Sequence, residues 1–97
     1  MILYVLYILY NVIGVKALPK KIEINLHGLE VLPAKKKLEK LLASCDNTVT
    51  EIVVIHGYHN GTGIKDMIKN ELRSKRISVI QPSILNPGVT TIYLKRK

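Results

Sequence analysis

The sequence predicts an α/β sandwich in which a four-stranded mixed sheet carries two helices, in the order β-α-β-α-β-β. Short runs of β-branched residues alternate with two longer segments whose apolar residues recur at helical spacing. A strand, a helix of about a dozen residues and a second strand form a parallel, right-handed unit in almost all known cases. The chain has 97 residues, which is enough for one domain with a single core.

The first half of the chain predicts a strand, a helix and a second strand. Residues 22–26 alternate apolar and polar side chains, as a half-buried strand does. Pro33 suits the first turn of the helix that follows, and Asp46 marks its end. The apolar stripe of this helix comprises Ala34, Leu38, Leu41, Leu42 and Cys45. Residues 52–55 form a continuous β-branched run, so we expect this strand to be covered on both faces.

The second half predicts one more helix and two strands. The apolar side of the helix comprises Ile64, Met67, Ile68 and Leu72. We expect its polar side to carry Lys65, Lys69, Arg73 and Arg76. Residues 77–80 and 89–94 read as strands, and the two prolines in residues 81–88 predict a loop between them.

Residues 1–20 differ in composition from the rest, and we predict that they form an apolar extension with a basic linker. Residues 21–97 form the predicted domain. Residues 1–15 carry no charge and hold three of the five tyrosines. This run is shorter than the ~20 residues of a typical spanning helix. It also lacks the basic start and cleavage site of a signal peptide. Three interpretations remain: a membrane anchor for a tethered interaction module, an extra element packed on the domain, or upstream sequence without a selected role.

The charge balance predicts a polyanionic partner. Fifteen Lys and Arg residues stand against seven Asp and Glu residues, which gives a net charge of +8. Such an excess favours binding to nucleic acid or to an anionic membrane surface. Cys45 is the single cysteine, which excludes a disulfide framework and a cysteine-based zinc motif. We therefore expect a reducing, cytoplasmic setting.

Two histidine-glycine turns follow predicted strands. His27-Gly28 comes after the first strand and His56-Gly57 after the second. Parallel strands bring their carboxyl ends to one edge of a sheet, so we expect the two imidazoles to lie side by side. Imidazole titrates near neutrality, so the pair could act as general acid and base on a phosphodiester. Together with His59 it could instead offer three nitrogen donors to a metal. The structural alternative is that the rings bond to the backbone and hold the turns.

The second turn is rich in glycine and precedes a helix. It is not a Walker-type phosphate loop, because Ile64 separates Gly63 from Lys65, and Asp66 stands where a dinucleotide fingerprint has its third glycine. Small residues at a helix start still expose backbone N–H groups and the positive end of the helix dipole, which favours a phosphate. The predicted phosphate-binding and nucleic-acid-binding residues are Gly57, Tyr58, His59, Gly61, Thr62, Gly63, Lys65 and Lys69. Among them, Tyr58 could stack on a splayed base. The alternative is an ordinary tight turn.

These motifs together resemble the Smr (small MutS-related) domain family. That family has an LDxHG-type end to its first strand and an HGxGxG sequence after its second. Leu26-His27-Gly28-Leu29 matches the first motif, and His56-Gly57 with Gly61-Thr62-Gly63 matches the second. Residues 87–90 are similar to the family's glycine-rich approach to its last strand. The resemblance spans about residues 22–94 and implies a sandwich similar to the C-terminal domain of translation initiation factor 3.

The resemblance implies a domain that binds structured or single-stranded DNA or RNA, and several family members nick it. His27 and His56 would then be the active-site imidazoles, and residues 61–63 the phosphate cradle. Asn25 occupies the catalytic position where the family usually has aspartate. An amide cannot act as a base, nor hold a metal as a carboxylate does. A domain that binds without cutting is therefore the alternative to an endonuclease, and a metal-assisted reaction would use a divalent cation such as Mg²⁺ or Mn²⁺.

Overall fold

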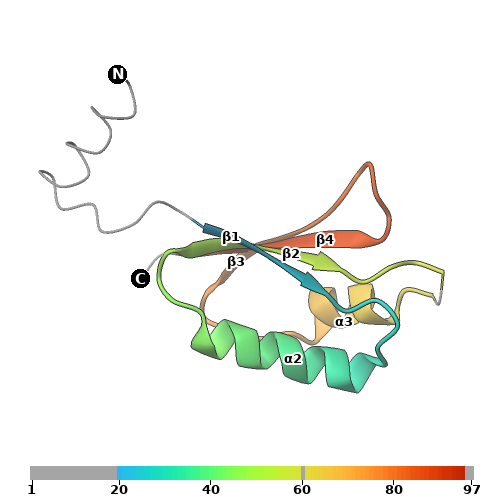
Figure 1. The fold of residues 1–97 in the computed structure, drawn as a ribbon, viewed down its shortest axis with the longest axis horizontal. Coiled ribbons are helices and arrows are strands. Elements are labelled where there is room, and N and C mark those ends of the chain that lie inside the picture. The colour runs from blue at the N-terminus through green and yellow to red at the C-terminus, as the bar shows by residue number, and fades with distance from the viewer. Residues whose placement is uncertain (1–19, 60, 96–97) are drawn as a thin grey trace, which may run out of the picture.

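The computed structural model describes residues 20–59 and 61–95, and all six predicted elements occur in the expected order (Figure 1). The elements are β1 (Lys20–Asn25), α2 (Val31–Ser44), β2 (Val49–Ile55), α3 (Gly63–Asn70), β3 (Ile77–Pro82) and β4 (Val89–Leu94). β4 has the bounds predicted for the last strand, and Pro33 lies in the first turn of α2, as predicted.

The N-terminal extension lies outside the described residues, except for Lys20, with which β1 begins. Its three interpretations stay predictions. Within the described residues, no helix combines the length and the apolar run that crossing a membrane requires.

The sheet is mixed, with the strand order β1-β2-β4-β3. β1 and β2 are parallel, and β4 runs antiparallel to both β2 and β3. The parallel pairing ends with Asn25 opposite Ile55, and the N–H of Leu26 then donates to the Ile55 carbonyl at 2.8 Å. The parallel connection predicted from the sequence is thus confirmed. It brings the residues that follow β1 and β2 to the same edge of the sheet.

Both helices lie on one side of the sheet, which makes a two-layer sandwich (Figure 1). The apolar stripe predicted for α2 is confirmed at Ala34, Leu38 and Leu42, all of which are buried. Burial of apolar surface between the two layers supplies the main stabilisation. The largest fully buried apolar side chains are Leu26, Leu38, Ile52, Val54, Met67, Ile68 and Ile92.

The prediction that β2 is covered on both faces is wrong for the described residues. Ile52 and Val54 are buried under the helices, whereas Val53 and Ile55 on the other face are only half-buried. A continuous β-branched run also reflects the preference of such residues for a pleated backbone, whatever covers the second face. Within the described residues, the face of β2 that points away from the helices is therefore only partly covered.

Arg76 corrects the prediction for the polar side of the second helix. α3 ends at Asn70, so both Arg73 and Arg76 lie beyond it, and the side chain of Arg76 is only 7 % exposed. Its guanidinium nitrogens Nη1 and Nη2 donate hydrogen bonds over distances of 2.8–3.3 Å to the carbonyls of Cys45, Asp46, Val49 and Lys95. The arginine thereby connects the end of α2 and the start of β2 to the residue that follows β4.

Asp46, predicted to end the first helix, lies two residues beyond its last residue, Ser44, in the turn that leads to β2. The carboxylate oxygen Oδ1 accepts hydrogen bonds from the hydroxyl of Thr48 and from its backbone N–H, the latter at 2.8 Å. These two bonds, the hydroxyl first, hold the pKa of the Asp46 carboxyl below its ordinary value. The turn places β2 in register beside β1.

Candidate functional site

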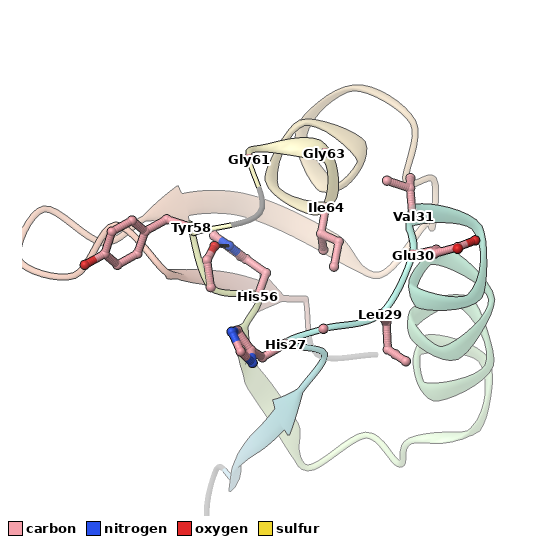
Figure 2. A pocket seen from close by; sticks show the side chains of 11 residues that line it. His27, Leu29, Glu30, Val31, His56, Tyr58, Gly61, Gly63 and Ile64 are labelled. Atoms are coloured by element: carbon pink, nitrogen blue, oxygen red, sulfur yellow. Dashed lines mark hydrogen bonds between the residues drawn. The ribbon is translucent and has the colours of Figure 1, made fainter.

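A cleft of about 370 Å³ opens at the sheet edge where β1 and β2 end (Figure 2). The turn after β1, the N-terminus of α2, the turn after β2 and the N-terminus of α3 form its walls. The lining includes six residues of the predicted site: His27, His56, Gly57, Tyr58, Gly61 and Gly63. The prediction that the two histidine-glycine turns meet is therefore confirmed.

His27 stands in the turn after β1 and is exposed. Its backbone N–H donates to Oδ1 of Asn25 at 2.9 Å, so the amide at the predicted catalytic position holds the turn. The imidazole lies directly on Gly57, where an added β-carbon would overlap the ring carbon Cδ2. Gly57 also has φ +73°, a conformation that favours glycine. Among the described residues, the ring of His27 has no hydrogen-bond partner.

His56 is held inside the protein, with 7 % of its surface exposed. Its Nδ1 lies 2.7 Å from the carbonyl of Gly57, and its Nε2 lies 2.8 Å from the hydroxyl of Thr90. A carbonyl can only accept, so in the neutral ring Nδ1 carries the proton and Nε2 accepts from Thr90. Both ring nitrogens are thus bonded, and His56 meets a substrate only when one of these bonds opens. Its predicted catalytic role stays a prediction.

The floor of the cleft is tied to the start of β4. The backbone N–H groups of His56 and Gly57 both donate to the carbonyl of Gly88, at 2.9 and 3.0 Å. A β-carbon on Gly88 would lie 3.1 Å from Cα of Gly57, which is a tight contact. The turn after β2 is therefore held by its contacts with both His27 and Gly88.

Two helix N-termini converge at the cleft. Gly63 at the start of α3 lies against Val31 at the start of α2, since a β-carbon on Gly63 would come 2.8 Å from Cγ2 of Val31. Neither helix receives a side-chain hydrogen bond at its cap residue, Glu30 or Thr62. The first backbone N–H groups of a helix lack partners within it, and they carry the positive end of its dipole. The cleft therefore favours an anionic group.

Other predicted residues lie at the margin of this arrangement. The hydroxyl of Thr62 donates to Asp66 at 2.8 Å, which occupies that side chain. Lys65 is half-buried in the first turn of α3, and Lys69 lies in the last turn, roughly 9 Å along the helix axis from Gly63. Their roles in binding phosphate stay predictions.

Tyr58, which lines the cleft, forms a stacked pair with His59. Their ring centroids are 4.4 Å apart, with planes inclined by 30°. Tyr58 is 51 % exposed, and its ring points away from His27 and Ile64 (Figure 2). This orientation leaves the ring of Tyr58 accessible from outside the cleft.

The residues do not fit a resident metal site. In the described part of the chain, no three His, Cys, Asp or Glu side chains gather around one point, so the predicted set of three histidines is not assembled. Mg²⁺ and Mn²⁺ prefer oxygen ligands. The carboxylate of Glu30, which lines the cleft, turns away from both imidazoles (Figure 2).

Sequence reasoning missed several residues that shape the site. Thr90 bonds to a histidine 34 positions away, and nothing in the local pattern around it indicates that contact. Glu30 and Val31 were missed because the sequence pattern marked the first turn of this helix only by Pro33. Gly88 had a recognisable signal, the Pro-Gly pair before the last strand.

Comparison with known proteins identifies the fold. No protein-family model matches the chain, and no curated protein matches its sequence. A search of solved structures finds the crystal structure of the Smr domain of MutS2 from Thermus thermophilus, with a TM-score of 0.68. The alignment has 23 % sequence identity and covers 76 % of this chain and 98 % of that one. The chain therefore has the fold of an Smr domain, as its motifs predicted.

Proposed function

We propose that this chain, folded as an Smr domain, binds nucleic acid by holding a backbone phosphate in the cleft between its two histidine-glycine turns. The observation that carries the proposal is that two uncapped helix N-termini and an exposed imidazole line one cleft. Backbone N–H groups at a helix start are well suited to phosphate oxygens. The net charge of +8 supplies the attraction that brings a polyanion to this surface.

The residues have different tasks in this proposal. His27 contacts the phosphate, because its ring is exposed and has no partner among the described residues. His56 is a positioning residue that holds the Gly57 turn through its bonds to Gly57 and Thr90. The exposed ring of Tyr58 stacks on a base, and Lys65 contacts a neighbouring phosphate.

The test of binding is the salt dependence of affinity for fluorescently labelled single-stranded and duplex DNA and RNA. Phosphate-led binding predicts a slope of roughly −3 to −6 when the logarithm of the binding constant is plotted against that of the salt concentration. Lys65→Gln should lower affinity for every sequence and reduce the magnitude of the slope by about 1. Binding that ignores salt would contradict the proposal.

Lys40→Gln is the matched control for this experiment. It removes the same charge from an exposed position on α2, about ten residues and roughly 15 Å from the helix start at the cleft. Its effect on affinity should therefore be clearly smaller than that of Lys65→Gln. Equal effects would mean that the whole basic surface binds diffusely and that the cleft is not the site.

Phosphodiester cleavage is the second candidate, and the unpartnered imidazole of His27 favours it. His27 could take or give a proton at a phosphodiester held beside it, as general acid–base catalysis requires. The test is incubation with labelled substrates, with and without Mg²⁺ or Mn²⁺. Cleavage that disappears in His27→Ala would establish it.

Asn25→Asp separates a binder from an enzyme. The side-chain oxygen of an aspartate can still accept the N–H of His27, so the turn should be retained. If the wild-type chain binds without cutting and the variant cuts, the amide at this position accounts for the missing activity. If neither cuts while both bind, the chain is a binding module.

A further inference from the structure

The loop between β3 and β4 exposes an adjacent pair of large aliphatic side chains. Ile84 is 92 % exposed and Leu85 is 95 % exposed, more than any other large apolar residue in the described part of the chain. The loop rises from the sheet edge on the side away from the helices (Figure 1). Single apolar residues on a surface are ordinary, whereas a pair at the tip of a projecting loop is a candidate contact.

This tip is held by hydrogen bonds at its base. The N–H of Asn86 donates to the hydroxyl of Ser83 at 3.1 Å, and the Asn86 side chain accepts from the N–H of Gly88 at 3.0 Å. The N–H of Ser83 also donates to the carbonyl of Val89 at 3.0 Å. The two aliphatic side chains therefore project from a closed hairpin, so little conformational entropy is lost when they make a contact.

The hairpin base is hydrogen-bonded to the turn after β2, which lines the cleft. The carbonyl of Gly88 accepts the N–H groups of His56 and Gly57. Leu85 is three residues from Gly88, so its backbone lies within roughly 10 Å of Gly88 even if the chain is extended. Bases in one strand of a duplex are spaced by about 3.4 Å, so this length of chain corresponds to a few nucleotides, and one strand can reach both the cleft and the tip.

We infer that Ile84 and Leu85 form an apolar wedge that packs against the bases of a nucleic-acid strand whose phosphate occupies the cleft. This inference rests on the proposed function and adds a base-contacting site to it. Leucine, isoleucine and proline are the side chains that nucleic-acid-binding proteins insert between base steps, and Pro87 follows in the same loop. The contact is independent of sequence, because apolar side chains form no hydrogen bonds with base edges.

The charge of the loop favours bases over a lipid surface. Residues 81–89 contain no charged side chain. A tip that entered an anionic membrane would gain from lysines or arginines beside it, and the loop has none. A nucleic-acid strand has a charged backbone and apolar base faces. The proposed phosphate site in the cleft would meet the backbone, and the uncharged tip would meet the base faces.

The test uses the full chain and a hairpin oligonucleotide with a single-stranded tail, in DNA and RNA forms, with 2-aminopurine placed at successive tail positions. Insertion of the wedge separates neighbouring bases, so binding should raise the fluorescence at one or two adjacent positions. Ile84→Ser with Leu85→Ser should abolish this rise and weaken binding by about tenfold, at the low end of the range for base stacking on a side chain. The salt slope should stay unchanged, because no phosphate contact is lost.

Two variants serve as controls. Val79→Thr alters an apolar residue of β3 that is 49 % exposed, and it should leave the fluorescence rise and the affinity unchanged. Ile84→Leu with Leu85→Ile keeps the apolar surface of the tip, and it should retain the rise.

The outcomes separate this inference from the proposed function. If the wild-type chain fails to bind either oligonucleotide, both are overturned. If it binds with the expected salt slope but without a local fluorescence rise, or if the serine variant keeps the rise, only the wedge is overturned. The wedge would also be overturned if the serine variant kept its fluorescence rise but lost binding to phosphatidylcholine–phosphatidylserine vesicles or lost self-association. The tip would then contact a membrane in the first case and a second copy of the chain in the other.

Discussion

The position of a single ring, that of His27, depends on the absence of a side chain at residue 57. Gly57→Ala should destabilise the protein by more than the roughly 1–2 kcal/mol that a left-handed conformation costs an alanine, because the new β-carbon also displaces the imidazole. Urea unfolding measures the stability, and the NMR signals of the His27 ring report its displacement. Gly28→Ala is the control, since Gly28 has φ +84° and nothing within 4 Å of an added β-carbon. It should cost stability and leave the affinity for nucleic acid closer to that of the wild type.

The hydrogen bond between His56 and Thr90 leads to a second prediction for single residues, which concerns stability. Thr90→Val keeps the shape of the side chain and leaves Nε2 of a buried imidazole without a partner. We expect a loss of about 1–3 kcal/mol in the free energy of unfolding. Thr91→Val, on the half-buried opposite face of β4, should change it by less than about 0.5 kcal/mol. Equal losses would show that the hydrogen bond does not hold the turn.

The sequence predicts which residues meet in the cleft better than it predicts what their side chains do there. The meeting of His27 and His56 follows from parallel pairing, which strand and helix lengths determine. The state of each ring depends instead on contacts with residues far along the chain. The ring of His56 is buried, and its Nε2 is bonded to the hydroxyl of Thr90. The ring of His27, by contrast, lies on Gly57 and is exposed. Local periodicity contains no information about such contacts.

At the level of elements, the predicted strands and α2 agree with the structure because their apolar residues recur over many positions. The end of α3 was harder to place. Leu72 continues the helical apolar pattern and is buried, yet the helix stops at Asn70. The backbone N–H of Leu72 donates to the carbonyl of Met67, five residues earlier, as the chain leaves the helix. Leu72 is thus buried by tertiary packing beyond the helix end, which is why the pattern extended too far.

Arg76 joins three elements, so its removal should affect the whole fold. Arg76→Met keeps much of the apolar stem and removes every guanidinium bond to the four carbonyls. Of these bonds the one to the Val49 carbonyl is buried, and a buried carbonyl without a partner costs about 1–3 kcal/mol, so we expect a loss within that range. Chemical denaturation measures it. Arg73 is exposed and, among residues 20–59 and 61–95, its guanidinium bonds only to the neighbouring Leu72 carbonyl, so Arg73→Met should stay within about 0.5 kcal/mol of the wild type.

At the scale of the whole molecule, the two-layer sandwich places all of its candidate contacts along one edge. The cleft, the Tyr58–His59 pair and the β3–β4 loop all lie where β1 and β2 end and β4 begins. The helices supply their N-termini to the same edge, because each follows a strand that ends there. One polyanionic strand running along this edge would meet a phosphate site and apolar surfaces in turn.

Because ligand binding to the native state raises stability, the whole-molecule expectation is a thermal shift. An oligonucleotide at a hundred times its dissociation constant should raise the free energy of unfolding by about 2.7 kcal/mol, or roughly 10 °C or more for a domain of this size. The unfolded chain carries the same charge of +8 and also attracts polyanions, which reduces the shift. Lys65→Gln and Lys40→Gln each remove one positive charge, so they weaken the attraction of the unfolded chain for polyanions equally. At one fixed oligonucleotide concentration, a smaller thermal shift in Lys65→Gln alone would therefore assign binding to the folded cleft. Circular dichroism follows the transition, and identical shifts in both variants would show that charge without structure accounts for the binding.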